Sequence, residues 1–301
     1  MKAARRLLPA LLALCLLLCG CTGDEAAAPA ETGPAPAAVP ARTPAPERPP
    51  YQELPVYMDG LLIDRGYVYE GTAFLSPEPL FDRAGLLMEY TPGPDGFTIS
   101  APGLALEAER SAEYLCANGR WFYTPLGCLE TGGRVYLPAE LLARLFSVSV
   151  SVGEDMLRAD INSAGLSLLR GGENYYELNF PAEDFYWLSR IIYSETRDQP
   201  MAGLIGVGNV VLNRVASDNF PDTVFNVIFD RKGAVQFDPA ADGSVLGEPD
   251  ERSVIAACLC LEGYNTVGES LYFVNPDRGD GSWFEASLRL VISIGDHDFY
   301  M

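Results

Sequence analysis

The clearest pattern in the chain is a stripe of apolar residues at helical spacing. Phe185, Leu188 and Ile192 recur at intervals of three and four, and Glu195 continues the same stripe. This spacing predicts a helix that carries a carboxyl group at the end of its apolar face. Because burial disfavours the charged form, we expect a raised pKa, as a general acid requires. The alternative is a Glu195 side chain that extends into solvent at the helix end.

A second helix is predicted from Pro200 onward, because proline suits a first helical turn and another apolar stripe follows it. That stripe consists of Leu204, Val207, Val211 and Val215. The same helix also contains Gly203, Gly206 and Gly208. Since glycine lowers helix propensity, these positions predict close packing of the helix backbone against a neighbour.

The rest of the C-terminal region predicts one more helix and a small β region. The helix is expected to begin near Asp250 and to end at Gly263, with its buried face formed by Val254, Ile255, Cys258 and Leu261. A β-branched and aromatic strand is expected at 271–274, and the chain closes with Ile292 to Ile294 followed by Gly-Asp-His-Asp-Phe-Tyr at 295–300. We therefore expect residues 183–301 to form a mainly helical domain with a short strand region around a groove.

Upstream lies an internal repeat, in which residues 71–90 align with residues 133–152. Each copy is typical of a short strand, a proline-started helical turn and an alternating strand. Between the copies, Asn118-Gly119 is flanked by apolar residues, which predicts a two-residue hairpin turn. Residues 53–163 are thus expected to form a small α+β module, followed by a linker over 164–182, and the chain as a whole belongs to the α+β class.

The repeat resembles the module known as the copper amine oxidase N-terminal-like domain. Residues 51–160 contain no histidine, so we interpret this module as a spacer or wall-contacting part without metal or catalysis. The chain has one histidine and no Cys-x-x-Cys pair, and we therefore expect no metal site and no cofactor. Cys116 and Cys128 are candidates for a disulfide outside the cell, although their spacing gives no geometric assurance. Cys258 and Cys260 are expected to be small core residues.

The first 20 residues have the composition of a secretory signal, with Lys2, Arg5 and Arg6 before an apolar run. The ending Leu-Cys-Gly before Cys21 resembles the lipobox of bacterial lipoproteins. This resemblance implies lipidation of Cys21 and attachment to a membrane, either at the outer face of the cytoplasmic membrane or in a spore envelope. Plain secretion with a fortuitous Cys21 is the alternative. Residues 21–52 are rich in alanine and proline and are expected to be a disordered tether.

The formal net charge of −20 argues against nucleic acid as a partner and predicts repulsion from anionic lipid headgroups. An acidic body on a lipidated tether is therefore expected to be attached to a membrane without lying on it.

The order of motifs in the C-terminal region is YSET, VGNVVLNRV, FPDTV, LYFVNP and IGDHDFY. It resembles the bacterial cell wall hydrolase family typified by the spore cortex-lytic enzymes, over roughly residues 184–300. The resemblance implies a lysozyme-like fold, cleavage of peptidoglycan between N-acetylmuramic acid and N-acetylglucosamine, and Glu195 as the catalytic acid. It also places seven residues in or near the substrate groove: Tyr193, Asn213, Gln236, Tyr272, Asn275, His297 and Tyr300.

The chain departs from this family at two places. Where the family usually has Ala-Arg-Gly-Glu after its catalytic glutamate, this chain has Thr196, Arg197, Asp198 and Gln199. We interpret this as an acidic residue moved by one position. The family's Ile-Gly-Asn-His appears here as Ile-Gly-Asp-His, ending at His297. Neither change touches Glu195, so we expect them to affect which form of the substrate is recognised more than the class of activity.

The number of suitable carboxyl groups favours lytic transglycosylation over hydrolysis. Hydrolytic glycosidases generally use two carboxyl groups. Glu195 is matched by the motif and lies on a predicted apolar face, whereas Asp198, Asp238 and Asp242 lie in polar sequence that we expect to be solvated. A lytic transglycosylase needs one acid, because the muramic 6-hydroxyl is the nucleophile and closes a 1,6-anhydro ring. We therefore favour lytic transglycosylation, on cortex with muramic-δ-lactam or on ordinary wall.

Several alternatives stay open. His297 is a second catalytic group or, as we prefer, a structural histidine that orders the last strand. Tyr272, Phe273 and Tyr300 stack on sugar rings or belong to the core. The chain as a whole is alternatively a non-catalytic peptidoglycan-binding lipoprotein or a hydrolytic muramidase. An amidase is disfavoured, because such enzymes normally need a zinc site.

Overall fold

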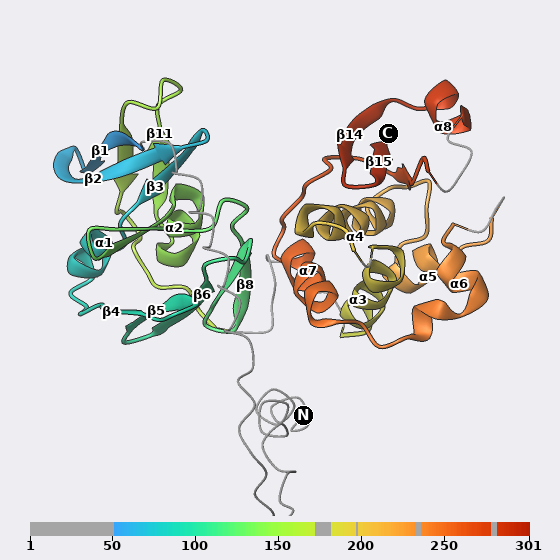
Figure 1. Ribbon diagram of the computed structural model, residues 1–301, viewed down its shortest axis with the longest axis horizontal. Coiled ribbons are helices and arrows are strands. Elements are labelled where there is room, and N and C mark those ends of the chain that lie inside the picture. The colour runs from blue at the N-terminus through green and yellow to red at the C-terminus, as the bar shows by residue number, and fades with distance from the viewer. Residues whose placement is uncertain (1–50, 172–181, 197, 233–235, 278–281) are drawn as a thin grey trace, which may run out of the picture. The chain divides into compact units, whose positions relative to one another are not determined.

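The computed structural model describes residues 51–171, 182–196, 198–232, 236–277 and 282–301 (Figure 1). Residues Pro50–Met301 form one compact unit. The expected signal sequence, the lipidation site Cys21 and the tether as far as residue 50 lie outside the described residues. Among the described residues, none of the helices combines the length and the apolar character needed to cross a membrane.

The described residues form an α+β structure with three sheets. Residues 51–171 are mostly strands, with two helices, α1 (Glu78–Arg83) and α2 (Ala139–Phe146). Their strands are β1 (Gln52–Met58), β2 (Leu61–Tyr69), β3 (Thr72–Leu75), β4 (Glu89–Pro92), β5 (Gly96–Ala101), β6 (Leu104–Glu109), β7 (Tyr114–Ala117), β8 (Arg120–Tyr123), β9 (Leu129–Thr131), β10 (Arg134–Pro138), β11 (Ser149–Val152) and β12 (Ala159–Asn162).

Residues 182–301 are mainly helical. Their helices are α3 (Ala182–Thr196), α4 (Met201–Val215), α5 (Val224–Ile228), α6 (Asp238–Asp242), the 3-10 turn η2 (Ser244–Leu246), α7 (Glu251–Leu261) and α8 (Ser282–Ser287). The small sheet consists of β13 (Tyr272–Val274), β14 (Leu290–Ile294) and β15 (His297–Tyr300), in the order β13-β15-β14. The mixed fold class that the sequence predicted is confirmed.

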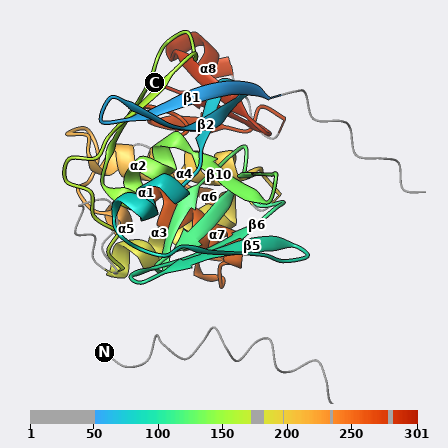
Figure 2. The same cartoon turned by 90° about the vertical axis from the view of Figure 1, so that its left-hand side faces the viewer.

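The strands of residues 51–171 make two sheets. One has the order β11-β12-β1-β2-β3-β10-β9, and the other is a meander, β4-β5-β6-β7-β8. Figure 2 shows β1 beside β2 and β5 beside β6. The pairing of β1 with β12 is parallel and brings Val56 opposite Ala159, so the first and last strands of this region lie together.

Both copies of the internal repeat form the predicted strand and proline-started helix, but their second strands lie in different sheets, β4 in the five-stranded one and β11 in the seven-stranded one. The first gives β3, α1 and β4, and the second gives β10, α2 and β11. A proline precedes each helix, Pro77 in the first copy and Pro138 in the second. The two copies meet where β3 pairs with β10, with Leu75 opposite Leu137.

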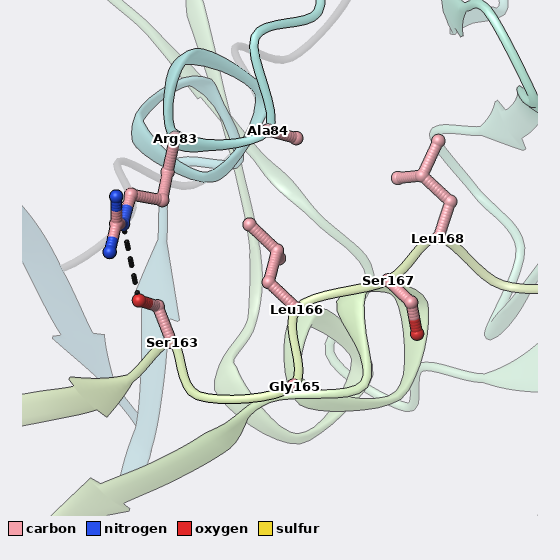
Figure 3. A pocket seen from close by; sticks show the side chains of 7 residues that line it. All are labelled: Arg83, Ala84, Ser163, Gly165, Leu166, Ser167 and Leu168. Carbon is pink, nitrogen blue, oxygen red and sulfur yellow. Dashed lines mark hydrogen bonds between the residues drawn. The ribbon is translucent and has the colours of Figure 1, made fainter.

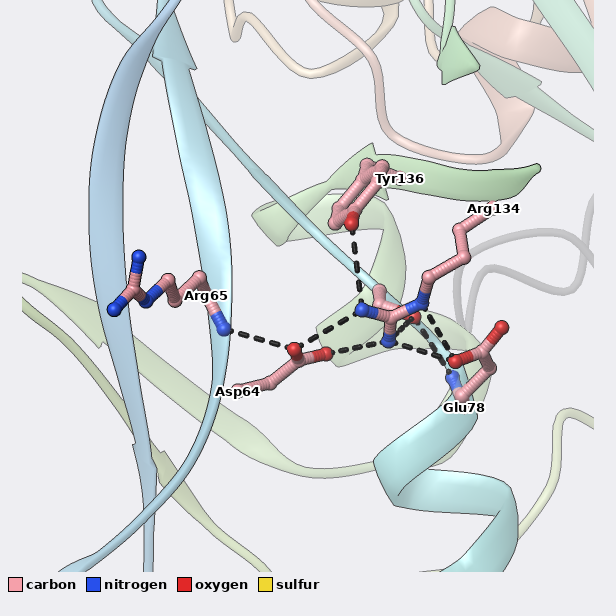
Figure 4. A network of polar contacts seen from close by, with 6 residues as sticks. Asp64, Arg65, Glu78, Arg134 and Tyr136 are labelled. Carbon is pink, nitrogen blue, oxygen red and sulfur yellow. Dashed lines mark hydrogen bonds and ion pairs between the residues drawn. The ribbon is translucent and has the colours of Figure 1, made fainter. Parts of the chain in front are cut away.

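Arg134, on β10 of the seven-stranded sheet, holds α1 against that sheet (Figure 4). Its Nη2 donates to Asp64 Oδ2 on β2 at 2.7 Å, and its Nε donates to Glu78 Oε2 in the first turn of α1 at 2.7 Å. Its Nη1 also donates to the hydroxyl of Tyr136 at 3.3 Å. A guanidinium can hold two carboxylates in fixed directions, so one side chain ties β2, α1 and β10 together.

The predicted hairpin joins β7 to β8. Asn118 and Gly119 both have positive φ, 51° and 78°, as a type I′ turn requires. The Asn118 side chain holds this turn in place, because its Oδ1 accepts from the Ala105 amide at 2.8 Å and its Nδ2 donates to the carbonyls of Gly103 and Leu169.

Helices α3, α4 and α7 lie next to one another (Figure 1), and their apolar faces form one core. The glycines of α4 explain how closely they approach. A Cβ on Gly208 would lie 2.6 Å from Cys260 Sγ and 2.9 Å from Ile192 Cδ1. A Cβ on Gly206 would lie 2.8 Å from Phe299 Cζ on β15. The close packing predicted from these glycines is confirmed.

Four short helical elements of residues 182–301 were not predicted: α5, α6, η2 and α8. They lie where the sequence shows no helical stripe, and local contacts account for the first two. The Thr223 side chain accepts from the Asn226 amide at the start of α5, and Gly243 ends α6 with a φ of 85°.

Cys116 and Cys128 are free thiols in this structure, and Cys258 and Cys260 are buried core residues, as expected.

Candidate active site at the end of helix α3

Glu195 lies in the last turn of α3. The helix is anchored by Leu188, Ile191 and Ile192, whose side chains are fully buried. Its last turn is closed by Ser194 Oγ, which donates to the Arg190 carbonyl at 2.7 Å, and by Thr196 Oγ1, which donates to the Ile192 carbonyl. The helix therefore holds the backbone of Glu195 in place, and its half-buried side chain keeps partial access to solvent.

The surroundings of Glu195 favour its neutral form. Burial is the largest cause and raises the pKa of its carboxyl group to about 7, with Asp238 and Asp242 adding to the effect through their negative charges. The direction of this shift agrees with the expectation from the apolar stripe. A carboxylic acid with a pKa near neutrality is protonated in part at physiological pH and can act as a proton donor.

The two aspartates near Glu195 come from α6, which packs against α3. Both are exposed, as the polar sequence suggested. No local pattern predicts that they lie near Glu195, because α6 is too short to show a periodic pattern. Asp242 accepts from the Ser244 amide at 2.8 Å, and this bond lowers the pKa of Asp242. The pKa values of Asp242 and Glu195 are thus shifted in opposite directions.

Gln199 joins the end of α3 to the turn between β14 and β15. Its Nε2 donates to Asp296 Oδ2 at 3.0 Å, and its Oε1 accepts from the Asp296 amide at 2.8 Å. The turn is closed by Gly295, where a Cβ would lie 2.1 Å from Gln199 Oε1. The two departures from the family pattern thus meet in space. The resemblance implies a carboxylate at the first position and an amide at the second, whereas this chain has the amide at 199 and the carboxylate at 296.

Asn213 and Asn275 hold the backbone on either side of β13. Asn213 Nδ2 donates to the carbonyls of Gly268 and Ser270 at 2.8 and 2.9 Å. Asn275 Oδ1 accepts from the Asp277 amide at 3.0 Å, which makes an Asx turn after the strand. These bonds fix the segment that contains Tyr272.

The small sheet brings together three of the residues that the resemblance singled out. Tyr272 on β13 lies directly opposite Tyr300 on β15. Tyr272 is half-buried and Tyr300 is buried. His297 is 5 % exposed, and its ring lies 5.3 Å from that of Phe273. A buried ring among aromatic rings is the position expected of a structural histidine.

Tyr193 and Gln236 lie closer in sequence to the acidic groups. Tyr193 is half-buried on α3, and Gln236 is half-buried just before α6. The structure thus has Tyr193 and Glu195 on α3 and Gln236 just before α6, and the other predicted residues on β13, β15 or the segments that hold them.

Arg214 is a structural contributor that the sequence analysis missed. It is 4 % exposed on α4, and its Nε donates to the Leu271 carbonyl at 2.7 Å. Its guanidinium lies 5.0 Å from the ring of Phe220 and 5.1 Å from that of Phe237. Burial lowers the pKa of Arg214 to about 10, so it remains a cation at neutral pH. It connects α4 with β13 and with the residue preceding α6.

A shallow, open pocket lies elsewhere in the molecule. It has a volume of about 410 Å³ and is lined by Arg83, Ala84, Ser163, Gly165, Leu166, Ser167 and Leu168 (Figure 3). Arg83 Nε donates to Ser163 Oγ across one side of it at 3.2 Å. Its lining comes from residues 51–171, so this pocket is separate from the surroundings of Glu195.

The model of the Cell Wall Hydrolase family matches residues 198–300. The C-terminal part of this chain belongs to the cell wall hydrolase family. The resemblance seen in its motifs is thereby confirmed, whereas the resemblance of the upstream module to the copper amine oxidase N-terminal-like domain stays a prediction.

The relatives of this chain agree with that family. The spore cortex-lytic enzyme of Bacillus cereus is 32% identical over 120 residues, which cover 40% of this chain and 45% of the relative. The enzyme of the same name from Halalkalibacterium halodurans is 34% identical over 125 residues, covering 40% of this chain and 37% of the relative. The chain thus spans less than half of the length of these curated relatives.

A solved structure of the same kind is the catalytic domain of the germination-specific lytic transglycosylase SleB from Bacillus anthracis. It is 32% identical to this chain, with 41% of this chain and 98% of that domain covered and a TM-score of 0.38.

Proposed function

We propose that this protein is a lytic transglycosylase that cleaves peptidoglycan between N-acetylmuramic acid and N-acetylglucosamine, with Glu195 as its proton donor. The observation that carries the proposal is the carboxyl group of Glu195, half-buried at the end of α3 with its pKa raised to about 7. Membership of the cell wall hydrolase family and the lytic transglycosylase activity named for SleB support it.

The reaction requires one proton donor that later accepts a proton. Neutral Glu195 protonates the glycosidic oxygen, and the bond from that oxygen to the anomeric carbon of the muramic residue breaks. The muramic 6-hydroxyl then attacks the anomeric carbon and gives its proton to the Glu195 carboxylate. The products are a 1,6-anhydromuramic end and a free glucosamine 4-hydroxyl, and Glu195 is neutral again. Positioned acid–base transfer of this kind contributes on the order of 10²–10⁴-fold to a rate.

The negative charges of Asp238 and Asp242 assist the first step. They raise the pKa of Glu195 and therefore keep its proton available near pH 7. They also favour the positive charge that develops on the sugar ring as the glycosidic bond breaks. In this proposal Tyr193, Gln236 and Tyr272 contact the glycan strand, and Asn213, Asn275, His297 and Tyr300 shape the groove.

Hydrolysis is the second candidate, and the position of α6 favours it specifically. A hydrolytic muramidase needs a second carboxylate to activate water or to attack the sugar. Asp238 and Asp242 both act electrostatically on Glu195 and stand on the neighbouring helix. Either would serve as that second group if a water molecule replaced the muramic hydroxyl.

Mass spectrometry of the products separates the candidates. Purified protein beginning at Thr22, which lacks the lipid site, is incubated with vegetative and with spore-cortex peptidoglycan. Lytic transglycosylation gives 1,6-anhydromuramic ends, whereas hydrolysis gives reducing ends. Binding of the polymer without any product would support a non-catalytic envelope protein and overturn both candidates.

The substrate and location follow from the same proposal. The names of the relatives point to spore cortex, which contains muramic-δ-lactam, and to a role in germination. We therefore propose that the protein is exported and attached to the envelope through Cys21. Faster release of fragments from cortex than from vegetative wall would support this substrate, and equal rates on both would contradict a preference for cortex.

A further inference from the structure

A buried carboxylate lies outside the proposed active site. Glu262 follows α7 and is 0% exposed. Two arginines bind it. Arg120 donates from Nε to Oε1 at 2.7 Å and from Nη2 to Oε2 at 2.6 Å, and Arg144 Nη2 donates to Oε2 at 3.1 Å and to the Glu262 carbonyl at 2.9 Å.

These partners come from distant parts of the chain. Arg120 begins β8, directly after the Asn118-Gly119 turn, and Arg144 lies on α2. Both therefore belong to residues 51–171, whereas Glu262 belongs to the cell wall hydrolase segment. The carboxylate is separated from Arg120 by 142 positions and from Arg144 by 118.

Aromatic side chains surround the buried charges. The guanidinium of Arg144 lies 5.1 Å from the ring of Phe122 and 4.8 Å from that of Tyr264. The rings of Tyr123 and Tyr264 are 6.0 Å apart. Trp121, on β8, packs against the core that α3 and α7 share. The contact therefore has an apolar part and a hydrogen-bonded charged part, as a specific protein interface does.

Because Glu262 is buried, its carboxylate can be accommodated only by partners such as Arg120 and Arg144 that bind its oxygens. A carboxylate without access to water is tolerated when guanidinium groups satisfy its oxygens, and loss of one partner leaves a buried charge without compensation. Glu262 would be such a charge if residues 51–171 were absent. The bidentate geometry with Arg120 also fixes the direction from which β8 approaches.

We propose that residues 51–171 are a built-in docking partner of the cell wall hydrolase segment, and that Glu262, held by Arg120 and Arg144, determines the docking. The end of α7 is then a protein-binding surface, and the upstream module is a fixed part of the enzyme. The compact unit formed by residues Pro50–Met301 agrees with this arrangement. The proposal uses no group of the Glu195 site and stands independently of the reaction.

The experiment cuts the folded protein between its two parts. A protease recognition sequence is inserted within residues 172–181, and the intact chain is purified and then cleaved. We expect the two pieces to elute together in size-exclusion chromatography. Glu262→Gln in one piece, or Arg120→Gln in the other, is expected to raise the dissociation constant of the pieces about 100-fold or more. The control is Glu53→Gln, which removes an exposed ion pair with Arg65 and should leave the constant unchanged.

Two results would overturn the proposal. The pieces of the unmodified protein could separate after cleavage, or the Glu262→Gln pieces could associate with a constant within twofold of the original. Thermal melting of each uncut variant shows whether it is folded. If Glu262→Gln does not fold, Arg120→Gln decides, because this side chain lies on a strand in the other piece.

Discussion

At the scale of single residues, the carboxyl pKa values of Glu195 and Asp242 are shifted in opposite directions. Glu195 is half-buried in the last turn of α3, and its pKa is raised to about 7. Asp242 is exposed and bonded to the Ser244 amide, which lowers its pKa. The opposite shifts distinguish Glu195, which can hold a proton near pH 7, from Asp242, which stays charged there.

The first prediction concerns the pH dependence of the rate. The reaction needs protonated Glu195, so activity should fall as the pH rises above about 7. Asp238→Asn removes a negative charge that raises this pKa, and the decline should then begin at lower pH. Rates of fragment release measured from pH 5 to pH 9 check this. Asp198→Asn, at an exposed position, is the control and should leave the profile unchanged.

The second prediction concerns stability. The folded-state pKa of Glu195 is about 7 and its ordinary value is 4.5, so the unfolded chain loses this proton first. The carboxyl group therefore favours folding most at low pH, and this contribution is lost between about pH 4.5 and pH 7. Gln at this position does not titrate. Glu195→Gln should thus gain stability relative to the parent on going from pH 4 to pH 8, by on the order of 2 kcal/mol.

Urea unfolding at the two pH values measures this gain. A difference between Glu195→Gln and the parent that is the same at pH 4 and pH 8 would show that the pKa of Glu195 is not raised.

At the scale of secondary structure, elements with a periodic or turn pattern of their own could be predicted, and those held by tertiary packing could not. Helix α3 follows from the stripe of Leu188 and Ile192, and the hairpin follows from Asn118-Gly119, because periodicity and turn chemistry are local. α6 has five residues and depends on Pro239 and Gly243 at its ends. Its position against α3, which brings Asp238 towards Glu195, depends on tertiary packing that no local pattern records.

The contact between Gln199 and Asp296 is a second example of tertiary packing that no local sequence pattern predicts. The sequence comparison suggested that an acidic residue had moved by one position along the chain. In the structure, Gln199 and Asp296 hydrogen-bond to each other across 97 positions. The resemblance implies a glutamate and an asparagine at these two positions, so the two departures together exchange amide and carboxylate within one hydrogen-bonded pair of this chain.

A swap experiment tests this explanation. Gln199→Glu would place two carboxylates at the 3.0 Å contact and should destabilise the protein by about 1–2 kcal/mol. Adding Asp296→Asn should restore stability, because an amide again faces a carboxylate. Chemical denaturation of the single and double variants measures both effects. If the losses of the two single variants simply add in the double variant, the pairing does not explain the exchange.

At the scale of the whole molecule, the cell wall hydrolase segment and the residues upstream of it are in contact. The family model covers residues 198–300, and the residues upstream of it contribute Arg120 and Arg144 to the contact with Glu262. The sequence predicted both parts separately, through the motifs and the internal repeat. It could not predict their contact, because a buried ion pair between distant positions leaves no local signal.

The charge of the molecule fits its proposed place. With a net charge of −20, the body of the protein is repelled by anionic lipid and nucleic acid, so attachment through Cys21 would hold it at a membrane without adsorption.

The central claim is that Glu195 alone supplies and recovers the proton. The most direct test compares fragment release from peptidoglycan by the parent and by Glu195→Gln, after thermal melting has shown that both are folded. We predict a loss of about 10²-fold or more, together with the loss of 1,6-anhydromuramic ends. A folded Glu195→Gln protein that releases the same anhydro products at the parental rate would contradict the account.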